Sequence, residues 1–334
     1  MSVVELAKTL INIESTSGAE RPMADYLQSY MEPKGWKTIR QEVAPGRDNI
    51  YFSRSGKTPR LLFNSHIDTV PPYFPATWDT EWIYGRGACD TKSLIAAQLH
   101  ACEILVTEGH EDIGLLYVVG EEVDHCGMIK ANELDLHPDF LIVGEPTESK
   151  LASRQKGILK IRLETHGKAA HSGYPETGVS AVEPLLDILS ALRAEPWPAE
   201  THLGETTMNI GVLGGGKAAN IVPDAAFADV LFRVVTSRDE ILERVTQLVA
   251  GRAKMSTIAS NDPWNLSTLD GYETQVVSFN TDIPYFNFDG KAFLWGAGSI
   301  LDAHTAGEKI RISDLQEAVT IYTGLARRLL ALPS

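Results

Sequence analysis

Short apolar runs alternate with a helical pattern in the first half of the chain, and this order constrains the fold more than any other feature. The runs lie at residues 61–63, 115–119 and 140–143, and a helical pattern at residues 93–107 separates the first two. Strands that alternate with helices form a largely parallel sheet that is covered on both faces. The sequence therefore predicts an α/β domain built on such a sheet.

A different order of elements begins near residue 157. The pattern there predicts strand, helix, strand, strand, helix and strand, ending near residue 259. This β-α-β-β-α-β order is that of a ferredoxin-like domain. We therefore expect a small α+β domain at residues 157–262, inserted between two parts of the first domain at residues 1–156 and 263–334.

An amphipathic helix is expected near each end of the sequence. Ser2 followed by Glu5 forms a capping box, and apolar residues recur after it at helical spacing. A similar pattern predicts a last helix from Ser313 to about Leu330.

The composition argues against several classes of protein. The 44 acidic residues outnumber the 30 basic ones, and the resulting net charge of -14 repels nucleic acids and anionic membranes. The 3 cysteines form no C-x-x-C pair, which argues against a disulfide framework and a thiolate zinc finger. No stretch has the apolar length of a signal peptide core or a membrane span. We therefore expect a cytoplasmic protein.

Histidine and carboxylate side chains follow the predicted strands or lie in polar loops. They are His66, Asp68, Asp90, Glu121, Glu122, Glu145 and His304. Ligands of open α/β sheets bind outside the carboxyl ends of the strands, where most of these residues fall. Imidazoles combined with carboxylates suit zinc, cobalt or manganese better than calcium. Two such ions bridged by one carboxylate are a common device for hydrolysis.

Each of these residues also has a purely structural interpretation. A His-x-Asp at a strand end is more often a hydrogen-bonded pair than a set of metal ligands, and two adjacent glutamates are more often part of a solvated loop. However, repelling carboxylates after a buried strand are costly without a cation. Taken together, the residues favour a metal site. The other histidines, His125 among them, are expected to be structural.

Five separated motifs support a resemblance to one family. They lie at residues 64–71, 85–92, 121–122, 144–147 and 303–304, and they span nearly the whole chain. In this order they resemble the M20 metallopeptidases, the group of acetylornithine deacetylase, succinyl-diaminopimelate desuccinylase and related carboxypeptidases. The resemblance implies an α/β fold, with a mostly parallel-sheet di-zinc catalytic domain and an inserted ferredoxin-like α+β lid domain.

The resemblance also implies a set of metal ligands. His66, Asp90 and Glu145 would bind one zinc ion, and Asp90, Glu122 and His304 would bind the other. Asp90 would bridge the two. The expected cofactors are two Zn²⁺ ions, with Co²⁺ or Mn²⁺ as substitutes.

Further roles follow from the same resemblance. Glu121 would be the general base that takes a proton from the attacking water, and Asp68 would orient His66. In the lid, His171 matches a histidine that stabilises the oxyanion, in dimeric members within the site of the neighbouring subunit. Asn220 and Arg233 match positions linked to substrate, and Arg233 could pair with a substrate carboxylate or form a structural ion pair.

The expected activity is hydrolysis of an N-acyl amino acid. The sequence around Glu145 resembles the deacetylase and desuccinylase branch, so N-acetylornithine, a substrate of arginine biosynthesis, is the leading candidate. A carboxypeptidase or dipeptidase that cleaves small peptides is the alternative. A homodimer formed through the lid is also expected.

Two other classes of protein share some of these features. A binding protein that keeps the fold without turnover would be expected to lose its general base, whereas Glu121 is present. A nucleotide-binding protein is suggested by residues 211–218, which nearly match a P-loop. Ala218 occupies the place of the hydroxyl residue that a P-loop requires, so this class is disfavoured.

Overall fold

The computed structural model describes residues 1–56 and 58–333, which form two compact units. The main unit comprises Met1–Ser153, Leu266–Gln275 and Thr281–Ser334, and the inserted unit comprises Arg154–Asn265 and Val276–Asn280. The inserted unit therefore begins before the expected residue 157 and includes a short returning segment. Strands β8 (Leu151–Gln155) and β16 (Thr274–Val277) lead the chain from one unit to the other.

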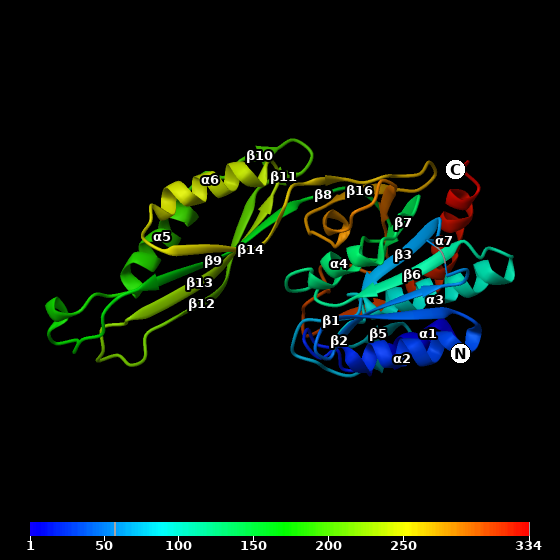
Figure 1. Ribbon diagram of the computed structural model, residues 1–334, viewed down its shortest axis with the longest axis horizontal. Coiled ribbons are helices and arrows are strands. Elements are labelled where there is room, and N and C mark those ends of the chain that lie inside the picture. The colour runs from blue at the N-terminus through cyan, green and yellow to red at the C-terminus, as the bar shows by residue number, and fades with distance from the viewer. Residues whose placement is uncertain (57, 334) are drawn as a thin grey trace. The chain divides into compact units, whose positions relative to one another are not determined.

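A six-stranded sheet with the order β1-β2-β6-β3-β7-β17 forms the centre of the main unit (Figure 1). Its strands are β1 (Lys37–Ala44), β2 (Arg47–Ser53), β3 (Leu61–His66), β6 (Ile113–Val118), β7 (Phe140–Val143) and β17 (Lys291–Leu294). Strands β6, β3, β7 and β17 are parallel, which confirms the expected architecture. The hairpin β1–β2 adds an antiparallel edge. Because every residue of β3, β6 and β7 is buried, these strands are covered on both faces.

Helices cover this sheet and supply much of the core. They are α1 (Val3–Ile11), α2 (Arg21–Met31), α3 (Lys92–Thr107), α4 (Cys126–Ala131) and α7 (Ile312–Leu330), with short 3₁₀ turns η1 (Glu32–Lys34), η2 (Asn132–Leu134) and η4 (Ile283–Tyr285). Helix α3 packs against α1 and α7. The Phe63 ring of β3 meets Tyr322 of α7 edge to face, with centroids 5.8 Å apart. The expected cap is present, since the Glu5 backbone N–H donates to Ser2 Oγ at 3.2 Å.

A second, three-stranded sheet in the main unit was not expected from the sequence. It has the order β18-β5-β4 and consists of β4 (Thr77–Trp78), β5 (Trp82–Tyr84) and β18 (Lys309–Arg311). Runs of two or three residues carry too little periodicity to be recognised as strands.

The inserted unit has the expected β-α-β-β-α-β order. Its elements are β9 (Gly157–His166), η3 (Pro175–Thr177), α5 (Val182–Ala194), β10 (Ala199–Glu200), β11 (Gly204–Glu205), β12 (Thr207–Gly215), β13 (Ala225–Val234), α6 (Arg238–Val249), β14 (Lys254–Asn261) and β15 (Trp264–Asn265). The four-stranded sheet of the inserted unit is antiparallel and has the order β12-β13-β9-β14, so β12 is an edge strand. Alternate residues of β13, such as Val230 and Phe232, enter a core with residues of α5 and α6.

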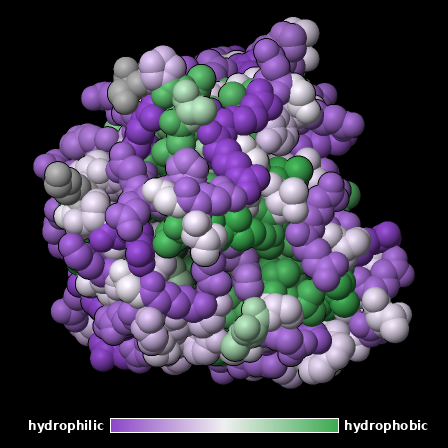
Figure 2. All heavy atoms as spheres, turned by 90° about the vertical axis from the view of Figure 1, so that its right-hand side faces the viewer, coloured by the Kyte–Doolittle hydropathy of each residue, from purple (hydrophilic) through white to green (hydrophobic). Residues whose placement is uncertain are grey.

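The surface has the composition of an ordinary folded protein. Figure 2 shows one face, where hydrophilic side chains predominate and a band of hydrophobic ones lies among them. Apolar atoms make up a large share of the surface of most folded proteins. Among the residues that the structure describes, no helix has the length and apolar character needed to span a membrane.

Candidate metal centre

Loops of the main unit bring the predicted histidine and carboxylate residues together. These residues are His66, Asp68, Asp90, Glu121, Glu122, Glu145 and His304. Three of the loops leave the carboxyl ends of the parallel strands β3, β6 and β7, which lie side by side. A fourth loop precedes α3, and the fifth lies between β17 and β18. The site therefore occupies the edge of the sheet where α/β proteins bind ligands.

The carboxylate of Asp90 lies between two imidazole rings. His66 Nε2 is 2.9 Å from Asp90 Oδ1, and His304 Nε2 is 3.2 Å from Asp90 Oδ2. Glu145 Oε1 lies 3.6 Å from His66 Nε2, and Glu122 Oε2 lies 2.9 Å from His304 Nε2. Each imidazole thus has one carboxylate of its own and shares Asp90 with the other imidazole.

The electrostatics of this cluster fit two cations. Burial, together with the charge of Asp90, raises the pKa of Glu122, and burial raises the pKa of Glu145 well above its ordinary value. For Asp90, burial also acts to raise the pKa, but hydrogen bonds from His304 and His66 outweigh it and the pKa falls. Carboxylates and neutral imidazoles gathered at such distances are the donor set of divalent transition metals. Metal ions would offset the repulsion among the carboxylates, so the residues fit a dinuclear metal site.

Asp68 lies against His66 with both its main chain and its side chain. The nearest acceptor to His66 Nδ1 is the backbone oxygen of Asp68 at 2.9 Å, whereas the Asp68 carboxylate is 3.6 Å away. That carboxylate also accepts hydrogen bonds from Ser17 Oγ at 2.7 Å and from the backbone N–H of Glu121 at 3.2 Å. Asp68 therefore faces His66 with its backbone oxygen and its carboxylate, and the carboxylate also fixes the backbone of Glu121.

Glu308 was missed by the sequence analysis. One oxygen of this buried carboxylate accepts backbone N–H groups of Gly87, Cys89 and Asp90 at 2.9, 3.0 and 3.1 Å. Its other oxygen pairs with the guanidinium of Arg86 at 2.6 Å. Glu308 thus holds the loop that carries Asp90. The only sequence signal for Glu308 was its position four residues after His304. A glutamate in a solvated turn would have the same position, so the signal was not specific.

His125 and Asp282 were also missed. His125 Nδ1 lies 2.9 Å from Asp282 Oδ1 and 3.9 Å from Glu121 Oε1. Burial is the main reason why the pKa of Glu121 is raised to about 8, and the charge of His125 opposes this rise. The two missed residues are far apart in the chain, so no local motif could connect them to Glu121.

Three further predicted residues lie in the inserted unit. His171 and Asn220 are exposed, and their segments pair through a backbone bridge between His171 and Ile221. Arg233 is half-buried on β13, on the face opposite the helices. Burial and the charge of Arg233 both lower the pKa of Lys156, which places two cationic groups near each other in this unit.

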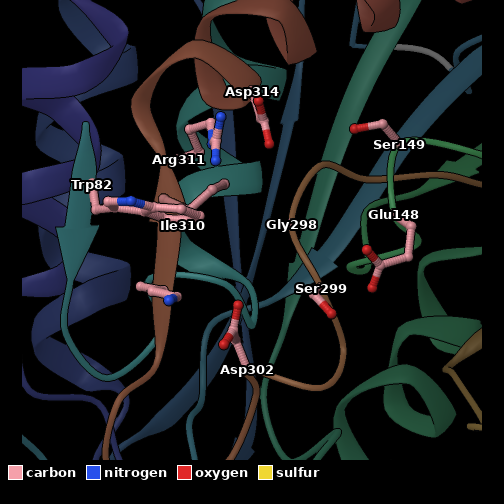
Figure 3. A pocket seen from close by; sticks show the side chains of 10 residues that line it. Trp82, Glu148, Ser149, Gly298, Ser299, Asp302, Ile310, Arg311 and Asp314 are labelled. Carbon is pink, nitrogen blue, oxygen red and sulfur yellow. The ribbon is translucent and has the colours of Figure 1, made fainter.

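A separate pocket of about 270 Å³ opens in the main unit (Figure 3). Trp82 lies on one side of it, and Glu148 and Ser149 lie on the other. Lys309 and Arg311 both contact the Trp82 ring, at 4.5 and 4.8 Å from its centroid. The lining residues do not include the candidate metal ligands, so we assign the pocket no part in the metal centre.

A sheet that gathers imidazoles and carboxylates at its carboxyl edge has the architecture of a metal-dependent amide hydrolase. Comparison with known proteins identifies the family. The peptidase dimerisation domain of the M20 family matches residues 153–256. A peptidase M20 domain-containing protein of Schizosaccharomyces pombe is 39% identical over 332 residues, which cover 96% of this chain and 83% of that protein. A probable carboxypeptidase of Aspergillus flavus is 35% identical and covers 95% and 85% of the two chains.

Solved structures show the same fold. An M20 family metallo-carboxypeptidase from Sulfolobus solfataricus superimposes with a TM-score of 0.81 at 19% identity, covering 99% of this chain and 100% of that one. Human carnosine dipeptidase 1 gives a TM-score of 0.76 at 14% identity, covering 99% and 96%. The chain belongs to the M20 family of peptidases and is a hydrolytic enzyme.

Proposed function

We propose that this enzyme cleaves the amide bond next to a C-terminal residue in short peptides, as a carboxypeptidase or dipeptidase. One observation carries the proposal of an amide hydrolase: the Asp90 carboxylate lies between His66 and His304. Glu121 lies beside this group. The relatives named as probable carboxypeptidases and the structural neighbours named as dipeptidases favour peptides over other amides.

The proposed ligands are those expected from the sequence. One metal ion would be held by His66, Asp90 and Glu145, and the other by Asp90, Glu122 and His304. When bound, the two ions would polarise the scissile carbonyl and make a water molecule acidic enough to lose a proton near neutral pH. Zinc is the proposed metal, with cobalt or manganese as substitutes.

Glu121 is the proposed general base. Its carboxylate would take a proton from the attacking water and deliver it to the nitrogen of the leaving amine. Side-chain exposure of only 12% keeps Glu121 largely out of bulk water. Burial raises the pKa of Glu121 to about 8 in the metal-free protein, and metal ions bound beside it would lower that pKa.

Residues of the inserted unit are proposed to recognise the substrate. Arg233 would pair with the free carboxylate of the substrate, and Lys156 adds a second positive charge in the same region. His171 is proposed to stabilise the oxyanion and Asn220 to contact the substrate. The match to a dimerisation domain supports a homodimer formed through this unit.

Deacetylation of an N-acyl amino acid such as N-acetylornithine is the second candidate. The sequence Gly144-Glu145-Pro146-Thr147, which resembles the deacetylase and desuccinylase branch, favours it. Both reactions break an amide bond next to a residue with a free carboxylate, so the same centre could perform either.

A combined metal analysis and substrate screen tests the proposal. The purified protein would be incubated with dipeptides, N-acetylornithine, N-succinyl-diaminopimelate and other N-acyl amino acids, with and without zinc, cobalt or manganese. Metal-dependent cleavage of dipeptides is the expected result, whereas a preference for N-acetylornithine would support the second candidate. Bound metal without turnover of any substrate would favour the binding-protein class, and no bound metal after reconstitution would contradict the proposal.

A further inference from the structure

We propose that His125 and Asp282 are positioning residues, which hold the carboxylate of Glu121 in its working orientation. The inference rests on the proposed role of Glu121 as general base. It adds two residues that the five sequence motifs do not assign to catalysis.

The first argument is the geometry around the His125 ring. His125 Nδ1 donates to Asp282 Oδ1 at 2.9 Å, and the same nitrogen lies 3.9 Å from Glu121 Oε1. The ring stacks on Tyr285, with centroids 4.2 Å apart and an angle of 16° between the planes. The hydrogen bond to Asp282 therefore holds the edge of the imidazole, and stacking on Tyr285 holds its face. A polar ring thus lies in a fixed position beside Glu121.

The second argument is burial. Side-chain exposure is 6% for His125, 2% for Asp282 and 12% for Glu121. A polar group that has left water needs partners inside the protein. In this cluster the imidazole of His125 is paired with the carboxylate of Asp282. The next carboxylate near the same ring is that of Glu121.

The third argument is the backbone of His125. Its φ is 58°, in the left-handed region that is uncommon for residues other than glycine, although asparagine, aspartate and histidine adopt it more often than most. The His125 N–H also donates to the oxygen of Gly120 at 2.8 Å, which closes the turn that contains Glu121 and Glu122. Glycine would satisfy this backbone without strain, so the strain is tolerated for the sake of the side chain.

An alternative role for Glu121, His125 and Asp282 is to bind another metal ion, because their polar atoms lie within 4.8 Å of one another. We favour positioning because the proposed role of Glu121 as general base requires that its carboxylate stay free to take a proton from water. Metal titration of the variants described below distinguishes the two roles.

The test uses His125→Gly, which removes the imidazole and relieves the backbone strain. The kcat of the metal-loaded enzyme on its best screened substrate should fall roughly 10–100-fold, the usual cost of losing a group that orients a reacting residue. KM should change less than about threefold, because ground-state binding is not involved. Zn²⁺ stoichiometry should be that of the wild type, and the loss of one Zn²⁺ per chain would instead support the additional metal site and overturn the positioning role.

Two further variants control this result. Asp135→Gly changes another residue with positive φ, 54°, whose exposed side chain pairs with His137, and it should leave kcat unchanged. His125→Asn keeps a nitrogen donor near the position of Nδ1 and suits the left-handed backbone, so it should recover part of the kcat lost in His125→Gly. An unchanged kcat in His125→Gly would overturn the inference. A kcat of His125→Asn no higher than that of His125→Gly would overturn it as well.

A double-mutant comparison separates this inference from the proposed function. In a Glu121→Gln background, His125→Gly should cost little further activity, because both changes disable the same group. Fully additive losses would overturn the positioning role while leaving Glu121 as the base. If Glu121→Gln itself kept normal turnover, the proposed base and the inference would fail together.

A readout without turnover completes the test. In protein labelled with ¹⁵N-histidine, Glu121→Gln should shift the ring resonances of His125 and leave those of exposed His137 in place. An unshifted His125 resonance would contradict the contact with Glu121 and overturn the inference.

Discussion

At the scale of single residues, the candidate metal centre combines two non-glycine residues of positive φ with buried carboxylates. His304, a proposed ligand, has a positive φ of 63°, as does His125 at 58°. Strained non-glycine residues of this kind concentrate at functional sites. The same centre buries several carboxylates whose pKa values are raised, which costs stability until cations are present.

Glu121→Gln is expected to reduce kcat by roughly 10²–10⁴-fold, the usual contribution of a general acid–base group. Glutamine has nearly the same shape but cannot accept the proton. Zinc content should stay at the wild-type value, because Glu121 is not a proposed ligand. Steady-state kinetics and metal analysis of one preparation would check both points, and near-normal kcat would assign the base elsewhere.

The metal-free protein is expected to lose stability as the pH rises from about 5 to about 8. A raised carboxylate pKa means that the folded state binds the proton more tightly, so folding is favoured at low pH. This contribution is lost between the ordinary pKa of 4.5 and the folded value, about 8 for Glu121. The pKa of His304, raised to about 10 by its bonds to Asp90 and Glu122, acts in the same direction.

Thermal unfolding of metal-free protein across this pH range would check the effect. Added Zn²⁺ should raise Tm more at about pH 8 than at about pH 5, because the metal competes with protons for the proposed ligands Glu122, Glu145 and His304. Glu121→Gln should make the loss of Tm shallower. A Tm of the metal-free protein that is level or increases with pH would disprove the assignment.

At the scale of elements, loops at one edge of the sheet hold the centre, and backbone hydrogen bonds fix those loops. Asp68 fixes the loop after β6, and Glu308 fixes the loop before α3. A carboxylate that accepts several backbone N–H groups sets the position of a main chain more firmly than packing alone. The position of Asp90 therefore depends on a residue that is distant in sequence.

Glu308→Gln is expected to lower the free energy of unfolding by about 3 kcal/mol, the low end of the range for breaking a buried ion pair. It should also weaken zinc binding roughly 10–100-fold, because Asp90 would lose its fixed position. Exposed Glu317 on α7 provides a matched control, and Glu317→Gln should change neither quantity. Denaturant unfolding and zinc titration would measure the effects, and unchanged zinc affinity would reduce Glu308 to a stabilising role.

The sequence was informative about elements that are long and periodic. The runs that became β3, β6 and β7 predicted the parallel sheet, and the sequence also predicted the order of the four long strands and two helices of the inserted unit. The short strands β4, β5 and β18 were missed. Glu308, His125 and Asp282 could not be identified, because their positions become informative only after the fold brings distant segments into contact.

At the scale of the whole molecule, the inserted unit offers a surface for assembly. Strand β12 pairs only with β13 within the described chain. Two of its apolar residues are exposed, Val212 to 46% and Leu213 to 56% of their surface. An edge strand with exposed apolar side chains is a template for pairing with another chain. Together with the match to a dimerisation domain, this favours a second copy of the same protein.

The particle in solution is expected to have twice the chain mass of 36.6 kDa. Replacing Leu213 with lysine should shift the population toward the monomer, because a charge would be buried against the neighbouring copy. Ile39 is an exposed apolar residue on β1, an edge strand of the main unit, so Ile39→Lys provides the control and should leave the mass unchanged. Sedimentation velocity would measure each protein, and a wild-type monomer would contradict the expectation.

The loop that carries Asp90 is held by residues from much later in the chain. His304 contacts the Asp90 carboxylate, and Glu308 accepts the Asp90 backbone N–H. During synthesis, residue 90 leaves the ribosome long before residues 304 and 308, whereas residues 154–265 of the inserted unit emerge as one continuous segment. The inserted unit can therefore fold while translation continues, but the loop with Asp90 must wait for residues 304 and 308 before its partners are present. A nascent chain thus completes the candidate metal centre only after it has already made the whole inserted unit.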